Sequence, residues 1–94
     1  MTAVLWSDLA NADLEAIDDY WVGYGQDAAE RVSARIEAAA AFLATMPRAG
    51  PVLKRQAARK WRIGQTPYVL IYRVTDLGIE VLRIRHGRED WDWL

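Results

Sequence analysis

The spacing of apolar residues changes once along this chain of 94 residues, and that change limits the folds that it can adopt. Before Pro47 the apolar residues recur every three or four positions, which is the spacing of one face of an α-helix. After Pro51 the chain contains runs of β-branched and aromatic residues, which favour β-strands. Helices followed by strands, without alternation between the two, predict an α+β fold with an antiparallel sheet.

The first half predicts a helical hairpin that follows a short edge strand at residues 4–6. Ser7 suits the N-cap of the first helix, and Asp27, with Glu30 three residues later, suits the N-cap of the second. The apolar stripes consist of Ala10, Leu14, Ile17, Trp21 and Tyr24 in the first helix and of Val32, Ile36, Ala39, Ala40 and Leu43 in the second. Because the link around Gly23 and Gly25 is short, we expect the two helices to run antiparallel.

The second half predicts strands within residues 58–64, 68–75 and 79–85. A three-residue loop at 76–78, with Gly78 in the left-handed region, suits a hairpin between the last two strands. The resulting register pairs Thr75 with Ile79, Tyr72 with Leu82 and Leu70 with Ile84.

This register assigns the side chains of the hairpin to two faces. The face expected under the helices holds Leu70, Tyr72, Val74, Leu82 and Ile84, with Glu80 near the turn. The other face holds Val69, Ile71, Arg73, Ile79, Val81, Arg83 and Arg85. A shift of one residue would set Leu70 against Arg83 and mix the faces, so we prefer the first register. Apolar residues interleaved with arginines on an uncovered face predict an interface.

Composition excludes several classes of site. The chain has no cysteine and one histidine, so neither a disulfide, a thiolate metal site nor a multi-histidine metal site is expected. No apolar run is long enough to span a membrane, and no basic segment precedes an apolar stretch as in a signal peptide. We therefore expect one domain over residues 1–94, in the cytoplasm, without a cofactor and without a membrane partner.

Charge is divided unequally between the halves. Residues 1–47 contain 2 basic and 8 acidic residues, whereas residues 48–94 contain 10 basic and 5 acidic residues. Arginine accounts for 10 of the 12 basic residues, and its planar fork suits carboxylates and phosphates. An acidic protein segment and a nucleic acid both match this half, and charge alone does not distinguish them.

Three groups of residues are candidates for function. Five of the nine positions from Lys54 to Arg62 are cationic, a pattern that also occurs on ordinary solvated surfaces. His86, the chain's one histidine, is either a general base or a structural hydrogen-bonding group, and strand alternation sets it on the face opposite Arg83. Aromatic residues gather late in the first helix and at the chain's end: Tyr20, Trp21, Tyr24, Trp91 and Trp93. These either complete the core or anchor a partner.

Several motifs resemble those of the RelE/ParE superfamily of toxins, and in particular its ParE branch, also called plasmid-stabilisation proteins. The motifs are Trp6-Ser7, Ala10, Asp13-Leu14, Ile17 and Tyr20, then Pro47-x-x-Gly50, Arg62, Tyr68-x-x-x-Tyr72-Arg73-Val74, and Ile84-Arg85-His86-Gly87-Arg88-Glu89-Asp90-Trp91. The resemblance extends over nearly the whole chain. It implies a helical hairpin packed on a small, curved antiparallel sheet of three or four strands.

The resemblance also implies the toxin component of a type II toxin–antitoxin system. The expected partners are a cognate antitoxin with an acidic C-terminal segment and DNA gyrase, which ParE-type members inhibit. Specific DNA binding belongs to the antitoxin, so none is expected of the toxin alone. RelE-type members instead cleave messenger RNA on the ribosome, and this is the alternative function.

The two branches need different residues. A ribonuclease would use Lys54, Arg62 and Arg83 to hold charge and either His86 or Glu89 as acid or base. The tyrosine common near the C-terminus of ribonucleolytic members is missing, since no tyrosine follows Tyr72. The residues expected to bind the antitoxin or the target are Tyr20, Tyr24, Arg62, Arg73, Arg83, Arg85, His86, Arg88, Trp91 and Trp93. We therefore expect a gyrase-binding inhibitor rather than an enzyme.

Overall fold

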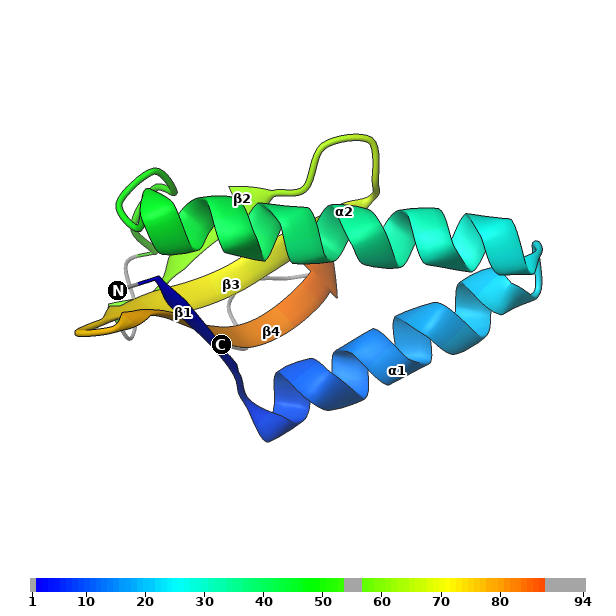
Figure 1. Ribbon diagram of the computed structural model, residues 1–94, viewed down its shortest axis with the longest axis horizontal. Helices are drawn as coiled ribbons and strands as arrows, with labels where there is room; N and C mark the ends of the chain where they lie inside the picture. The colour runs from blue at the N-terminus through cyan, green and yellow to red at the C-terminus, as the bar shows by residue number, and fades with distance from the viewer. Residues whose placement is uncertain (1, 54–56, 88–94) are drawn as a thin grey trace.

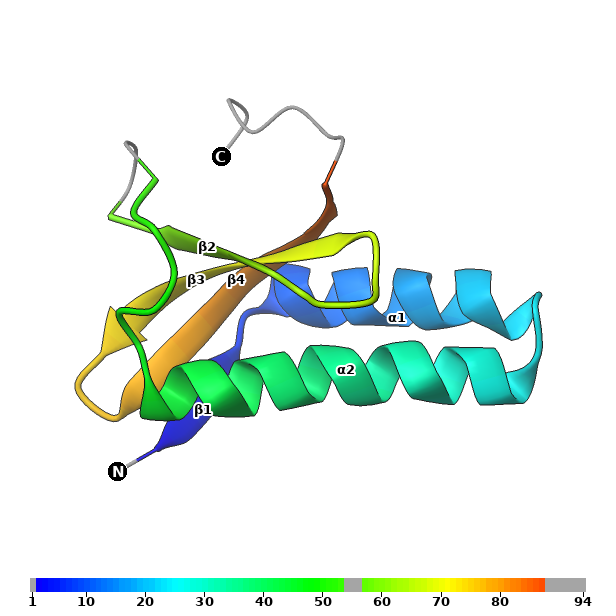
Figure 2. The ribbon, with the colours of Figure 1, turned by 90° about the horizontal axis from the view of Figure 1, so that it is seen from above.

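The computed structural model describes residues 2–53 and 57–87 and has an α+β architecture (Figure 1). Its elements are β1 (Ala3–Trp6), α1 (Asp8–Val22), α2 (Gln26–Thr45), β2 (Arg59–Arg62), β3 (Tyr68–Thr75) and β4 (Gly78–His86). The two helices run side by side and pack on one face of a four-stranded sheet (Figures 1 and 2). The predicted N-terminal hairpin on a small sheet is therefore confirmed. Within the described ranges, neither helix is long and apolar enough to cross a bilayer.

The sheet is mixed rather than wholly antiparallel. Its strand order is β1-β4-β3-β2, and β1, at one edge as predicted, pairs with β4 in parallel. The backbone N–H of Ala3 donates to the Leu77 carbonyl (2.7 Å), and that of Ser7 donates to the Val81 carbonyl (3.0 Å). Both helices and two strands lie between β1 and β4 in sequence. This connection is long enough for β4 to run in the same direction as β1. Parallel pairing generally requires such a long crossover.

The helix starts were predicted correctly in α1 and wrongly in α2. The Ser7 Oγ accepts a hydrogen bond from the Ala10 backbone N–H (3.0 Å) and caps α1. The N-cap of α2 is Gly25, with φ of 129°, and Asp27 lies inside the first turn. The Gly25 N–H donates to the Val22 carbonyl at 3.0 Å, so the link is too tight to leave Asp27 outside the helix.

The predicted register between β3 and β4 holds along only half of the hairpin. Leu70 pairs with Ile84 as expected, but the register shifts between Ile71 and Tyr72. Beyond this bulge Tyr72 pairs with Val81 instead of Leu82. The pairing then ends with Thr75 opposite Gly78 instead of Ile79, so the loop has two residues, Asp76 and Leu77. The one-residue shift that the sequence argument rejected is therefore the register near the turn.

The bulge exchanges residues between the two faces, because shifting a strand by one residue reverses its side chains. Ile79 and Val81 lie in the core, whereas Leu82 is only half-buried and outside it. Glu80, which was expected on the core face, forms an ion pair with Arg73, its partner across the strands. The buried core cluster contains Ala10, Ile36, Ala40, Leu43, Ala44, Ile63, Tyr68, Leu70, Tyr72, Ile79, Val81 and Ile84.

The opposite face of the hairpin is also less exposed than predicted. Val69 and Ile71 are 6% and 0% exposed, and Val81 has moved to the core side. These three residues were expected to be exposed together, and that expectation is wrong. The face therefore does not present the apolar patch on which the interface prediction depended.

Gly78 is required by the close approach of β1. Its φ is +151°, and a Cβ at this position would lie 2.1 Å from the Ala3 carbonyl oxygen. We predict that Gly78→Ala lowers the free energy of unfolding by about 3 kcal/mol, since β1 must move away and the backbone is strained. Urea denaturation measures this. Gly64→Ala is the control, since no atom lies within 4 Å of its added Cβ, and a change beyond about 0.5 kcal/mol there would contradict the steric argument.

The Tyr72 hydroxyl fixes the chain that leaves α2. It donates to the Pro47 carbonyl (2.7 Å) and accepts from the Gly50 N–H (3.0 Å). Arg59 Nη1 donates to the Gly50 carbonyl at 2.7 Å and secures the same segment. Desolvation by burial raises the pKa of Tyr72 above its ordinary 10.0, partly opposed by the Gly50 hydrogen bond and by the Arg59 charge.

We predict that Tyr72→Phe costs about 1–3 kcal/mol at neutral pH, because it leaves the Gly50 N–H and the Pro47 carbonyl without this partner. The raised pKa makes the tyrosine's contribution complete below about pH 10, and it is lost as pH rises through the folded-state value. The difference in unfolding free energy between Tyr72→Phe and wild type should therefore shrink above about pH 10. A constant difference between pH 7 and pH 11 would contradict this assignment.

Candidate functional site

The carboxylate of Asp13 joins α1 to β4. It accepts hydrogen bonds from Arg83 Nε (2.8 Å) and Arg83 Nη2 (3.0 Å), which is a two-point contact. It also accepts the backbone N–H of Ile84 at 2.9 Å. The side chains of Arg83 and Asp13 are 20% and 15% exposed, so the pair is largely desolvated. Two-point contacts between an arginine and a carboxylate are among the stronger ion pairs in proteins.

This contact follows from the end of β1. The last β1 residue paired with β4 is Trp6, opposite Val81, so the edge of β4 beyond Val81 has no strand beside it. Ser7 Oγ donates to the Leu82 carbonyl at 2.8 Å, and Asp13 accepts the Ile84 N–H. Side chains from the start of α1 thus replace the missing strand, as buried backbone groups require partners.

Arg83 was predicted to hold a phosphate or an acidic segment, and the structure instead places it against Asp13. Sequence reasoning did not identify Asp13 as its partner. A signal was present, because Asp13 lies three residues after Ala10 and four before Ile17, and so falls on the apolar stripe of the helix. An acidic residue on a buried stripe usually has a cationic or hydrogen-bonding partner.

We predict a coupling energy of about 2 kcal/mol between Asp13 and Arg83, measured by a double-mutant cycle of Asp13→Ala and Arg83→Met in urea denaturation. The more exposed pair of Arg73 and Glu80 (2.6 Å, side chains 52% and 24% exposed) is the matched control and should give less than about 1 kcal/mol. Equal coupling in the two pairs would mean that burial does not strengthen the Asp13 contact.

The remaining predicted cations do not form one continuous patch. Arg73 is engaged by Glu80, and the Nε atom of Arg85 is buried. Arg62 is exposed and, with Lys60, lines a hollow of about 410 Å³ that also includes Pro51, Trp61, Val69 and Gly87. The predicted residues Lys54, Arg88, Trp91 and Trp93 lie outside the described residues.

Aromatic residues form a cluster at the end of α1 and in the link that follows it. The Tyr20 and Tyr24 hydroxyls are 3.3 Å apart and their side chains are 57% and 68% exposed, so both present aromatic surface to solvent. The hydrogen bond with Tyr24 raises the pKa of Tyr20. Trp21 instead packs against the core, and its Nε1–H donates to the Tyr68 hydroxyl at 2.9 Å.

His86 belongs to the helix side of the sheet. Its ring lies 6.0 Å from that of Tyr68, edge to face, and Tyr68 is part of the core cluster. In β2, Trp61 packs against the core, whereas the next residue, Arg62, is exposed. Because successive strand residues point to opposite faces, His86 and Arg62 lie on different sides of the sheet. The histidine and this arginine therefore do not meet in one site.

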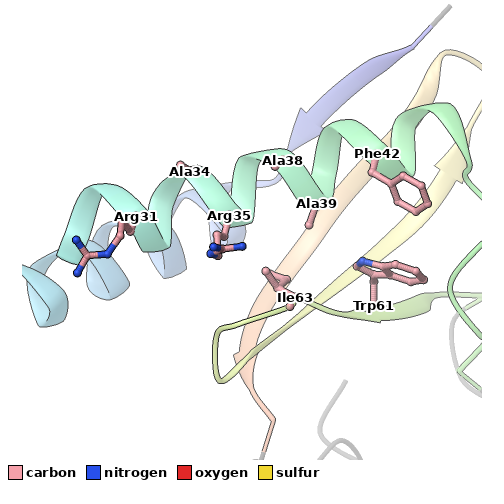
Figure 3. A pocket seen from close by; sticks show the side chains of 9 residues that line it. Arg31, Ala34, Arg35, Ala38, Ala39, Phe42, Trp61 and Ile63 are labelled. Carbon is pink, nitrogen blue, oxygen red and sulfur yellow. The ribbon is translucent and has the colours of Figure 1, made fainter. Parts of the chain in front are cut away.

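A groove separates α2 from β2 (Figure 3). It measures about 520 Å³ and is lined by Arg31, Ala34, Arg35, Ala38, Ala39, Phe42, Trp61, Ile63 and Gly64. The rings of Phe42 and Trp61 are 5.4 Å apart at one end, and the two arginines lie toward the other (Figure 3). Sequence reasoning did not single out this groove. The indication in the sequence is Phe42, the chain's single phenylalanine, which is adjacent to the buried Leu43.

Acidic residues and histidine do not gather into a metal site anywhere in the described ranges. The described surface thus includes exposed aromatic side chains, a groove and a basic hollow, which are formed by helices, strands and the segments that join them.

Comparison with known proteins gives a consistent result. The family model described as "ParE toxin of type II toxin-antitoxin system, parDE" matches residues 4–91. Toxin RelE2 of Caulobacter vibrioides is 37% identical over 87 residues, which cover 93% of this chain and 97% of that protein. Putative toxin Y4kP of Sinorhizobium fredii is 31% identical over 88 residues, covering 94% of this chain and 91% of that protein.

One solved structure has the same fold over nearly its full length. It is described as "Chromosomal ParDE TA system from P. aeruginosa" and superposes with a TM-score of 0.79 at 27% identity. The match covers 92% of this chain and 96% of the other.

Proposed function

Because this chain belongs to the ParE toxin family of type II toxin–antitoxin systems, we propose that it inhibits DNA gyrase by binding it and that a cognate antitoxin neutralises it. The observation that favours a binding toxin over a ribonuclease is the pair of Arg83 with Asp13. In this pair the charge of Arg83 is directed at Asp13, whereas RNA cleavage would require that charge to face the substrate.

RNA cleavage requires three functions in one place. A base must deprotonate the 2′-hydroxyl, cations must hold the charge of the phosphorane, and an acid must protonate the leaving oxygen. Arg83 directs both Nε and Nη2 at Asp13, and its charge is thereby balanced. His86 and Arg62 lie on opposite sides of the sheet. These arrangements weigh against a ribonuclease centre at the residues that the sequence suggested.

Tyr72 is not a suitable replacement for His86 as the acid or base of a ribonuclease. Tyr72 is fully buried, and its hydroxyl already bonds Pro47 and Gly50. Since burial raises its pKa, the phenol stays protonated at neutral pH and is a poor general base.

Binding to gyrase needs a surface rather than an acid–base pair. We assign to this surface the exposed aromatics Tyr20 and Tyr24, because tyrosine side chains supply large contact area at low entropic cost and are common in interface hot spots. The sequence-based candidates Arg85, His86, Arg88, Trp91 and Trp93 remain part of the same proposal. An acidic antitoxin segment is the expected partner for the arginine-rich second half.

A ribosome-dependent ribonuclease is the second candidate function. It is favoured by the name of the relative Toxin RelE2 and by the basic hollow at Lys60 and Arg62, which suits a phosphate backbone. In this alternative the hollow rather than Arg83 holds the substrate, and the position of His86 on the other side of the sheet from Arg62 weighs against His86 as its acid or base.

We predict that the purified toxin, in molar excess, stops ATP-dependent supercoiling by DNA gyrase and generates no new 5′ ends in messenger RNA during ribosomal translation. A supercoiling gel and primer extension measure the two activities. New 5′ ends that disappear in His86→Ala, together with unaffected supercoiling, would replace the gyrase proposal with the ribonuclease.

The Tyr20→Ala/Tyr24→Ala variant should need at least about tenfold more protein to stop supercoiling, as expected on losing an aromatic hot spot. Leu9→Ala is the control, because Leu9 is an equally exposed apolar residue (59%) near the start of α1. Equal inhibition by all three proteins would remove the tyrosines from the target surface.

A further inference from the structure

The two edges of the sheet are protected to different degrees. At one edge, β2 carries three cations, Arg59, Lys60 and Arg62. Its outer side is partly covered by the preceding segment, since Val52 forms a bridge with Arg59 and the Lys60 N–H donates to the Pro51 carbonyl at 3.1 Å. Charged residues and a covering segment are common devices that keep a sheet edge from pairing with another chain.

The strand β1, at the other edge, has neither form of protection. Its four residues, Ala-Val-Leu-Trp, include no charge and no proline. On its inner side β1 pairs with β4, and no other strand in the described part of the chain lies beside it (Figures 1 and 2). An uncharged and unpaired strand edge is a template for the addition of a further strand.

The pairing of β1 with β4 determines which backbone groups face outward. The N–H groups of Ala3 and Ser7 donate to carbonyls on the β4 side, at 2.7 and 3.0 Å. Since the backbone groups of successive strand residues alternate in direction, those of Leu5 also face β4. The N–H and carbonyl groups of Val4 and Trp6 therefore point away from β4, at the open edge.

The middle of β1 also exposes a large apolar side chain. Leu5 is 51% exposed, whereas Val4 and Trp6 pack against the core on the helix side of the sheet. Leu5 thus points to the opposite face, where its neighbour on β4 is Glu80, which forms an ion pair with Arg73 on β3. A further strand beside β1 would cover this leucine.

We propose that β1 is the interface of a homodimer, in which the β1 strands of two copies pair antiparallel about a two-fold axis at Leu5. In this register Val4 of each copy lies opposite Trp6 of the other, and their outward N–H and carbonyl groups form two hydrogen-bonded pairs. Leu5 lies opposite Leu5 of the second copy at a non-hydrogen-bonded position, where side chains come closest. The two four-stranded sheets then form one continuous sheet.

The occupant is a second copy because the edge is complementary to itself. A two-fold interface requires a surface that matches its own copy, and here Val4 matches Trp6 on either side of a pair of leucines. Along the row of side chains that crosses the sheet at Leu5, the first charge is Glu80. The two Glu80 residues would lie three strand spacings apart, about 14 Å, which exceeds the Debye length at physiological salt. An acidic antitoxin segment, by contrast, finds no cation within β1.

The interface is short, and short interfaces give weak complexes. We therefore expect a dimer that forms as the protein concentration rises and dissociates on dilution. Sedimentation equilibrium of the full chain, without antitoxin, measures this from about 10 μM to about 1 mM.

Three variants test the two-fold axis. Leu5→Glu and Leu5→Lys should each raise the dimer Kd at least about tenfold, because like charges directly opposite each other are destabilising. An equimolar mixture of these two proteins should dimerise again, since position 5 of one copy faces position 5 of the other. Val52→Glu is the control, because Val52 is 58% exposed at the opposite edge of the sheet, and it should leave Kd unchanged. Circular dichroism and urea denaturation establish that each variant is folded.

Amide hydrogen exchange, followed by NMR, tests the register. The N–H groups of Val4 and Trp6 should exchange more slowly as the protein concentration rises, because they become bonded to the second copy. The Leu5 N–H faces β4 in the monomer, and its exchange should not depend on concentration in this way.

A monomer at about 1 mM would overturn the proposal. A dimer that both Leu5 variants leave intact would also overturn it, since its interface would lie elsewhere. Protection of the Val4 and Trp6 amides that appears only when the antitoxin is added would do the same, because the added strand would then belong to the antitoxin. These measurements use the toxin alone or with its antitoxin, so their outcome does not depend on whether the toxin inhibits gyrase.

Discussion

The carboxylate of Asp13 is the contact on which the arrangement of helices and sheet depends. It reaches from α1 across 70 residues of sequence to Arg83 and to the backbone of Ile84, where β4 has lost β1 as its neighbour. Asp13 and Ser7 together supply hydrogen-bond partners to β4 where α1 lies beside it, since Ser7 donates to the Leu82 carbonyl. A hydrogen-bonded and largely desolvated ion pair of this kind fixes orientation more than it adds net stability.

Its functional consequence is that Arg83 serves the fold. Arg73 is likewise engaged by Glu80, so the cations that the sequence assigns to a single face are divided among different partners. Other surfaces of the described residues are open to solvent: the exposed tyrosines at and after the end of α1, the groove along α2 and the hollow beside β2. Three separate surfaces suit the recognition that we propose, by a target and by an antitoxin.

The sequence predicts those features that depend on local chemistry. The Ser7 cap, the helical stripes apart from the exposed Tyr24, and a hairpin between β3 and β4 could all be recognised, because each depends on neighbouring residues. The register near the turn could not, because a β-bulge between Ile71 and Tyr72 shifts it and because β4 contacts Ser7 and Asp13, which are distant in sequence. The same limit explains why Arg83 was assigned to a partner and why the groove, formed by Phe42 and Trp61 from separate elements, was missed.

The central claim is that this toxin acts through a binding surface and not through a catalytic centre built on Arg83. A calorimetric comparison of the purified toxin with purified gyrase and with programmed ribosomes tests it most directly. The account predicts a saturable complex with gyrase and no measurable heat with ribosomes. Tight binding to ribosomes without any binding to gyrase would contradict it.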